Sequence, residues 1–115
     1  MTYIMQLHDA PFAAVKRGAK TVELRLNDEK RRRIRIGECI TFLSRADSSQ
    51  SLTVRVTALH PFPSFRELYQ ALPLIQCGYS EQELSTASYE DMNIYYTAEE
   101  IERYGVVGIE FELLT

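Results

Sequence analysis

Three stretches of this sequence alternate apolar and polar residues with a period of two, the pattern of β-strands with one buried face. They are residues 22–26, 52–57 and 106–113. Shorter β-favouring runs at 3–7 and 39–43 bring the expected number of strands to five. Because a chain of 115 residues has room for one core of useful size, these strands are expected to form one small sheet or barrel.

Short helices are predicted between the strands from capping residues and apolar spacing. Asp9 is expected to cap a helix that stops near Gly18, and Ser64 to cap one that ends before Pro73. A polar turn at residues 47–51 should join the third and fourth strands as a hairpin. The other predicted helices cover Lys30 to Arg33, Ser80 to Leu84 and the segment after Thr97. Strands mixed with short helices place the chain in the α+β class.

Composition limits the classes of function. Apolar residues make up 45% of the chain and charged residues 25%, close to the globular average, so disorder is not expected. No run approaches a membrane span and no signal peptide is recognisable, so we expect a cytoplasmic protein without a membrane partner. The cysteines Cys39 and Cys77 and the histidines His8 and His60 lack metal-ligand spacing. Neither a metal nor a cofactor is therefore predicted.

Charge is distributed unevenly along the chain. Residues 1–35 carry nine Lys and Arg against four Asp and Glu, whereas residues 67–115 carry one against ten. A polyanion would be attracted by the first segment and repelled by the second. Any nucleic-acid contact is thus expected on one face, although charge of this kind also occurs as a simple solvated surface.

The strongest candidate site lies on the second predicted strand. Alternation places Glu23 and Arg25 on one face of it, with Lys20 at its entrance. Two cations and a carboxylate on a rigid strand have the chemistry to hold a phosphate or carboxylate group. The alternative is an exposed face with an ordinary Glu–Arg pair, which contributes under about 1 kcal/mol.

A series of motifs extends over nearly the whole chain in a fixed order. They are Pro11-Phe12, Gly18-x-Lys20-Thr21-x-Glu23-x-Arg25, Asp28-Glu29-Lys30, Ile36-Gly37-Glu38-x-Ile40-x-Phe42, Ser64-Phe65-x-x-Leu68-Tyr69, Tyr95-Tyr96 and Tyr104-Gly105-Val106-Val107-Gly108-Ile109. In this order they resemble the bacterial single-domain branch of the ASCH domain family. The resemblance implies one PUA-like domain over residues 1–115, with a barrel of about five to six mostly antiparallel strands and short helices around its mouth.

The resemblance also implies a function. It predicts a cleft lined by Lys20, Glu23 and Arg25 that binds RNA or a nucleotide-like small molecule. Some family members are amidohydrolases of acylated cytidines or are credited with ribonuclease activity, and the amidohydrolases pair the motif lysine with a nearby threonine and a later glutamate. This chain has Glu23 where we would look for that hydroxyl, and its only nearby hydroxyl is Thr21. If the protein is an enzyme, the catalytic candidates are Lys20, Thr21 and Glu23.

Further ligand contacts are predicted outside the motif. Lys30 and Arg31 begin a basic run that could meet a phosphate backbone, or that forms a solvated helix face. Tyr95 and Tyr96 could stack on a base, or could be core residues. The environment of Glu23 discriminates between the two functions: pairing with a cation keeps it ionised and favours binding, whereas a raised pKa in an apolar pocket favours catalysis.

Overall fold

The computed structural model describes residues 2–114, and its five strands form one mixed sheet in the order β1-β3-β4-β5-β2. The first pair, β1 with β3, is parallel, and the other three pairings are antiparallel. This confirms the predicted α+β fold and its mostly antiparallel sheet. The strands are β1 (Thr2–Leu7), β2 (Val22–Leu26), β3 (Cys39–Ser44), β4 (Ser51–Phe62) and β5 (Val106–Leu113).

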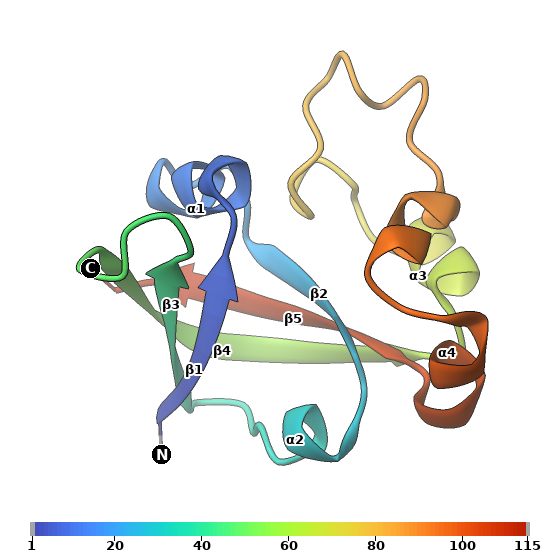
Figure 1. Ribbon diagram of the computed structural model, residues 1–115, viewed down its shortest axis with the longest axis horizontal. Coiled ribbons are helices and arrows are strands. Elements are labelled where there is room, and N and C mark those ends of the chain that lie inside the picture. Colours follow the sequence, from blue (N-terminus) through green and yellow to red (C-terminus); the bar gives the residue numbers. More distant parts are fainter. Residues whose placement is uncertain (1, 115) are drawn as a thin grey trace.

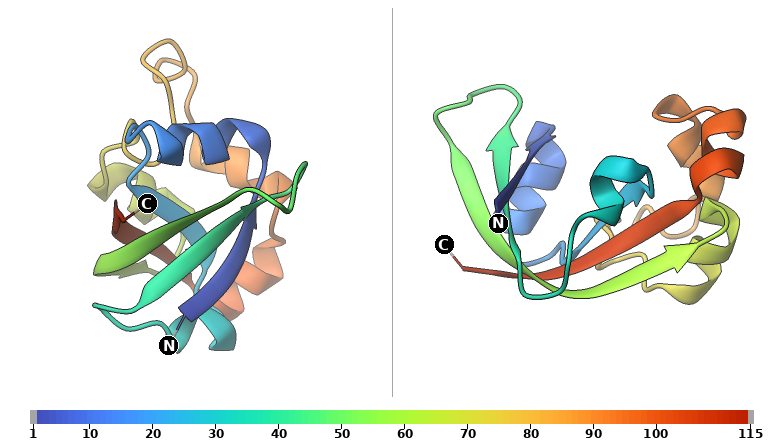
Figure 2. Two further views of the ribbon diagram at one scale, coloured as in Figure 1. Left: turned by 90° about the vertical axis from the view of Figure 1, so that its left-hand side faces the viewer. Right: turned by 90° about the horizontal axis from the view of Figure 1, so that it is seen from below.

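The sheet is strongly curved into a half-barrel. The two longest strands, β4 and β5, bend along their length and form a trough when seen from below (Figure 2). An irregularity in their pairing between Val56 and Ala58 contributes to this bend, since a bulge increases the local twist of a strand. The strands β1 and β2 form the two edges of the sheet.

Short helices lie at both ends of the trough (Figure 1). One end carries α1 (Asp9–Lys16), close to β1 and β3, while the other carries three helical segments. These are α3 (Phe65–Ala71), the 3-10 helix η1 (Tyr89–Ile94) and α4 (Ala98–Tyr104); α2 (Glu29–Arg32) follows β2. Within residues 2–114, none of the helices has the length and apolar character needed to cross a lipid bilayer.

The buried side chains form two clusters. One packs α1 against the curved sheet through residues such as Phe12, Phe42 and Phe111, and the rings of Phe42 and Phe111 meet edge to face. The other joins β2 to α3 and η1 through residues such as Leu24, Leu68 and Met92. Because α1 and the α3–η1 region pack on separate clusters, a space between them is left for the cleft described below.

Several sequence-based predictions of elements are wrong. His8, rather than Asp9, is the N-cap of α1, and no side chain caps that helix. Residues 80–84 form consecutive turns instead of a helix, although the predicted capping bond from Ser80 N to Glu83 Oε1 is present at 2.8 Å. The strand β4 continues through Pro61, beyond the predicted end at residue 57. At Pro61 the strand pairs with β5 alone, so the missing N–H is tolerated.

The helix η1 was not predicted at all. It is short and lacks the repeated apolar spacing that would indicate a helix from sequence. Its first turn is instead held by a capping box, in which the Ser88 hydroxyl accepts from Glu90 N and Asp91 accepts from Ser88 N. This cap fixes the position of Asp91, which lines the cleft.

Candidate functional site: a charged cleft on the second strand

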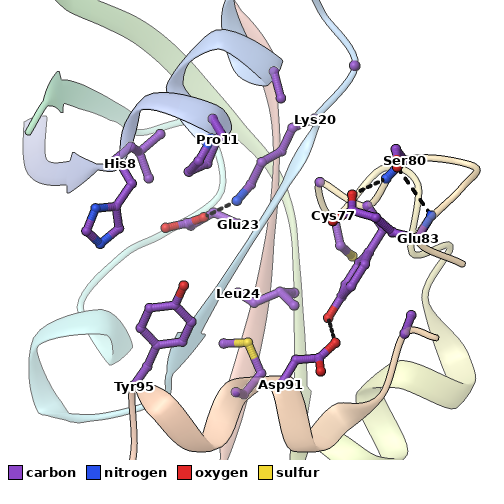
Figure 3. A pocket seen from close by; sticks show the side chains of 18 of the residues that line it. His8, Pro11, Lys20, Glu23, Leu24, Cys77, Ser80, Glu83, Asp91 and Tyr95 are labelled. Carbon is purple, nitrogen blue, oxygen red and sulfur yellow. Dashed lines mark hydrogen bonds and ion pairs between the residues drawn. The ribbon is translucent and has the colours of Figure 1, made fainter.

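A cleft of about 770 Å³ opens between α1 and the segment that contains residues 75–96. The end of β1 and α1 form one wall, and the second strand forms the floor. The opposite wall consists of the loop after α3 and of η1. Figure 3 shows Lys20 and Glu23 near His8 and Pro11, with Asp91 and Tyr95 on the other side of the space.

The three motif residues all line this cleft, and Glu23 and Arg25 lie on the same face of β2, as alternation predicted. The Lys20 Nζ atom lies 2.7 Å from Glu23 Oε1, and Arg25 Nε lies 2.7 Å from Glu23 Oε2. Lys20 is 8% exposed and Glu23 is 5% exposed, while Arg25 is half-buried. Each oxygen of the carboxylate therefore has its own cationic donor, and the glutamate holds both cations in place.

The protonation state of Glu23 follows from this geometry. Burial raises the pKa of the carboxyl group, but the charges of Lys20 and Arg25 and the hydrogen bonds from both outweigh that effect. The net result is a pKa below the ordinary value of a glutamate. Glu23 is therefore ionised at neutral pH, and it is a poor general acid there.

Arg25 also connects the two edges of the sheet. Its Nη2 atom donates to the backbone carbonyl of Gln6 at 3.1 Å, and Gln6 belongs to the edge strand β1. With Nε directed at Glu23, the guanidinium plane is fixed on two sides. The Nη1 group makes no hydrogen bond within residues 2–114, so this arginine keeps donors that a ligand in the cleft could use.

The loop after α3 covers Lys20. Its Gln76 carbonyl accepts from Thr21 N at 2.8 Å and from Val22 N at 3.0 Å, which ties the loop to the start of β2. Gly78 follows with φ +112°, and a Cβ there would lie 3.3 Å from Lys20 Cδ. Glycine thus permits both the backbone conformation and the close approach to the lysine.

Cys77 in the same loop is a buried thiol. Burial raises its pKa to about 11, although the charge of Lys20 acts in the opposite direction. The thiol is therefore protonated at neutral pH and is not a reactive nucleophile. Its side chain belongs to the core cluster of β2 and α3, and it also lines the cleft.

The opposite wall contains a chain of hydrogen bonds that the sequence analysis missed. The Tyr79 hydroxyl donates to Asp91 Oδ2 at 2.8 Å, and the Tyr69 and Tyr79 hydroxyls are 2.7 Å apart. Burial, followed by the hydrogen bonds to Tyr69 and Asp91, raises the pKa of Tyr79 well above its usual range, so it stays a neutral donor. The only signal in the sequence was the Ser88-x-x-Asp91 capping spacing, because the tyrosines lie on different elements.

The predicted tyrosines both line the cleft but differ in environment. Tyr96 is half-buried and stacks on Phe65 with ring centroids 6.0 Å apart, so it is part of the second core cluster. Tyr95 is exposed, and Figure 3 shows its ring facing the cleft. Of the two, Tyr95 is the side chain available for stacking.

The other predicted residues lie elsewhere. Thr21 does not line the cleft, and Lys30 and Arg31 line a small separate hollow beside β1. Arg31 pairs with Asp28 at 3.2 Å, while Arg32 donates to two backbone carbonyls, so much of the basic run serves local structure. The cations that the sequence analysis overlooked are those on the cleft rim, Arg17 and Arg45.

The histidine, cysteine and acidic side chains of residues 2–114 do not gather into a metal site. Among residues 2–114, no group of three or more His, Cys, Asp or Glu side chains is arranged to hold a metal ion. On the floor of the cleft, two cations, Lys20 and Arg25, share the carboxylate of Glu23.

Comparison with known proteins identifies the family. The family model of the ASCH domain matches residues 5–115. The chain belongs to the ASCH domain family. This family has a PUA-like fold of a kind generally associated with RNA binding. The residues that carried the sequence resemblance, Lys20, Glu23 and Arg25, all lie within the matched region.

Solved structures of this family resemble the chain over almost its full length. The hypothetical protein PH0355 is 30% identical with a TM-score of 0.81, covering 99% of this chain and 100% of that one. Protein PF0455 from Pyrococcus furiosus is 33% identical with a TM-score of 0.73, covering 99% and 98%. A mutant of ZmASCH from Zymomonas mobilis is 14% identical with a TM-score of 0.67, covering 96% and 68%, and shows the fold alone. Curated protein sequences gave no significant match.

Proposed function

We propose that this protein is a single binding domain whose cleft accepts single-stranded RNA or a nucleotide. Lys20 and Arg25 contact the phosphate, and Glu23 holds the two cations in position. The observation that carries the proposal is the buried carboxylate with one cation 2.7 Å from each oxygen. Such preorganised cations bind an anion without first having to be ordered.

The rim of the cleft supports the same function. Arg17 and Arg45 are exposed beside the cleft, while the chain as a whole carries a net charge of -3. A polyanion would therefore be attracted to this region and repelled by most of the remaining surface. The exposed ring of Tyr95 offers a stacking surface at the same place, which suits an unpaired base.

Hydrolysis of an acylated nucleoside or of RNA is the less favoured alternative. It would need Glu23 to exchange a proton near neutral pH, whereas its lowered pKa keeps it ionised. A covalent mechanism would also need a side-chain nucleophile, but Thr21 does not line the cleft and the Cys77 thiol has a pKa of about 11. Binding requires neither group to react.

The proposal is tested by comparing Arg25→Ala with Arg33→Ala, a variant that removes an exposed arginine of the basic run. Affinity for a fluorescently labelled single-stranded RNA of mixed sequence would be measured by anisotropy. Charge-assisted hydrogen bonds contribute roughly 1.5–3 kcal/mol, so Arg25→Ala should weaken binding at least about tenfold. Arg33→Ala should change it less than about twofold.

Thermal melts of both variants are the control, because the loss of Arg25 leaves Glu23 with one partner. The milder Arg25→Lys substitution keeps the charge but loses the planar fork, and it should also weaken binding. If the folded Arg33→Ala protein bound more weakly than the folded Arg25→Ala protein, the basic run would be the binding site and the cleft would not.

A further inference from the structure

The cleft has walls of opposite charge. Lys20 lies on one side, together with Arg25, which is bonded to the same carboxylate. Asp91 and Glu83 lie away from Lys20 on the other side (Figure 3). A plain polyphosphate fits only the first side, because the carboxylates would repel it. The cleft therefore matches a ligand that has an anionic group at one end and hydrogen-bond donors at the other.

Asp91 is the group on the second wall that is held most firmly. Its Oδ2 atom accepts from Tyr79 Oη at 2.8 Å and from Ser88 N at 3.2 Å. Within residues 2–114, no hydrogen bond reaches Oδ1 and no salt bridge joins the carboxylate to a cation. One oxygen is thus fixed by the protein, and the other remains an acceptor on the wall of the cleft.

The direction of the hydrogen bonds among Tyr69, Tyr79 and Asp91 is set by the single proton of each tyrosine hydroxyl. Tyr79 donates its single hydroxyl proton to Asp91 Oδ2. Tyr79 then accepts from Tyr69 at 2.7 Å. The chain runs from Tyr69 to Tyr79 to Asp91, and it orients the carboxylate from behind in the way that supporting groups orient a binding residue.

We propose that Asp91 determines base specificity, and that the cleft selects nucleotides whose base carries an exocyclic amino group. This inference rests on the proposed nucleotide-binding function. With the phosphate at Lys20 and Arg25, the base extends towards the second wall. The Asp91 carboxylate there can accept a hydrogen bond from an exocyclic amino group, but it repels the carbonyl oxygen of an oxo base. Tyr79 is a positioning residue that acts through Asp91.

The test uses pairs of nucleotides that differ by amino and oxo groups at one ring position, CMP with UMP and AMP with IMP. Isothermal titration calorimetry of the full chain at fixed low salt gives the affinity of each. We expect the amino-bearing member of at least one pair to bind at least about fivefold more tightly, in line with the discrimination typical of a specific base contact. Asp91→Asn should reduce this ratio below about twofold.

Two further variants separate base recognition from structural damage. Tyr79→Phe removes the bond to Asp91, so it should lower the amino-to-oxo ratio while affinity for the oxo nucleotides changes little. Glu90→Gln removes one negative charge from the same helix at a residue that does not line the cleft, and it should leave the ratio unchanged. Because the ratio compares two ligands on one protein, partial loss of stability does not move it.

The outcomes distinguish the two proposals. If both members of each pair bind equally and Asp91→Asn changes nothing, the specificity inference is wrong but nucleotide binding stands. If no nucleotide binds and the labelled RNA does not bind either, the proposed function fails and this inference fails with it. If Glu90→Gln lowers the ratio as much as Asp91→Asn does, general charge rather than a contact by Asp91 sets the preference, which also overturns the inference.

Discussion

Within residues 2–114, the sheet carries two glutamate–arginine pairs that differ in spacing and burial. Glu23 and Arg25 lie in the cleft with 2.7 Å between the charged atoms and side chains only 6% and 17% exposed. Glu112 and Arg55 pair across β4 and β5 at 3.5 Å, with side chains 55% and 49% exposed. The residue types are the same, so the difference in what each pair can do comes from burial and from the second cation, Lys20, that Glu23 also holds.

Burial gives the Glu23–Arg25 pair a large desolvation cost, but it also holds the two side chains in a fixed position. Removing a carboxylate and two cations from water has a large cost, which is offset only while all the partners are in place. The exposed pair has no such cost, and water and salt screen its attraction. A preorganised anion site therefore requires the buried pair, whereas the surface pair contributes little to either stability or recognition.

The largest expected difference between the two regions concerns stability. Glu23→Ala leaves Lys20 and Arg25 facing each other without their shared carboxylate, and it should lower the free energy of unfolding by about 3–5 kcal/mol. The matched variant Glu112→Ala should change it by less than about 1 kcal/mol. Urea denaturation followed by circular dichroism measures both. Equal effects would mean that burial does not distinguish the two pairs.

The pH dependence of stability provides a second, smaller contrast. The pKa of Glu23 is lowered in the folded protein, so folding favours its ionised form. The resulting stabilisation is complete above the pKa of an unfolded glutamate, about 4.3, and is lost as the pH falls through the lower pKa of the folded state. Between pH 6 and pH 3, wild type should thus lose more unfolding free energy than Glu23→Gln.

Other carboxylates with lowered pKa values, such as Asp47 and Glu67, are present in both proteins and cancel in this comparison. Urea denaturation at each pH would measure the difference. If the unfolding free energies of wild type and Glu23→Gln changed in parallel from pH 6 to pH 3, the assignment of a lowered pKa to Glu23 would be wrong.

The smallest expected effect concerns two glycines with positive φ. Gly78→Ala adds backbone strain at φ +112° and a Cβ 3.3 Å from Lys20 Cδ, whereas Gly18→Ala adds strain at φ +81° in open space. In each variant, the backbone strain should lower the free energy of unfolding by about 1 kcal/mol. Only Gly78→Ala should also weaken RNA binding, since it displaces Lys20. An equal loss of affinity in both variants would exclude a special role for the loop that covers the lysine.

Much of the fold followed from local patterns. Alternation located β2, β4 and β5, β-favouring runs located β1 and β3, and the hairpin between β3 and β4 was predicted from one polar turn. Alternation also placed Glu23 and Arg25 on the same face, because side-chain direction along a strand depends only on the strand itself. The motif series identified the ASCH family. The wrongly predicted helix at residues 80–84 shows the limit of local signals, since the capping hydrogen bond forms there although the backbone forms turns and no helix.

The tertiary structure decided which charged groups could share a site. Sequence could not indicate that Glu23 is buried, that Arg25 reaches the carbonyl of Gln6, or that the basic run at residues 30–33 does not line the cleft. Nor could it reveal Asp91, which meets Tyr79 only after the loop beyond α3 folds back. Periodicity records the geometry of one element, but burial and electrostatic pairing arise between elements that are distant along the chain. The sequence by itself therefore determined the strands, the family and the motif, while long-range packing turned that motif into a buried ion cluster opposite an acidic wall.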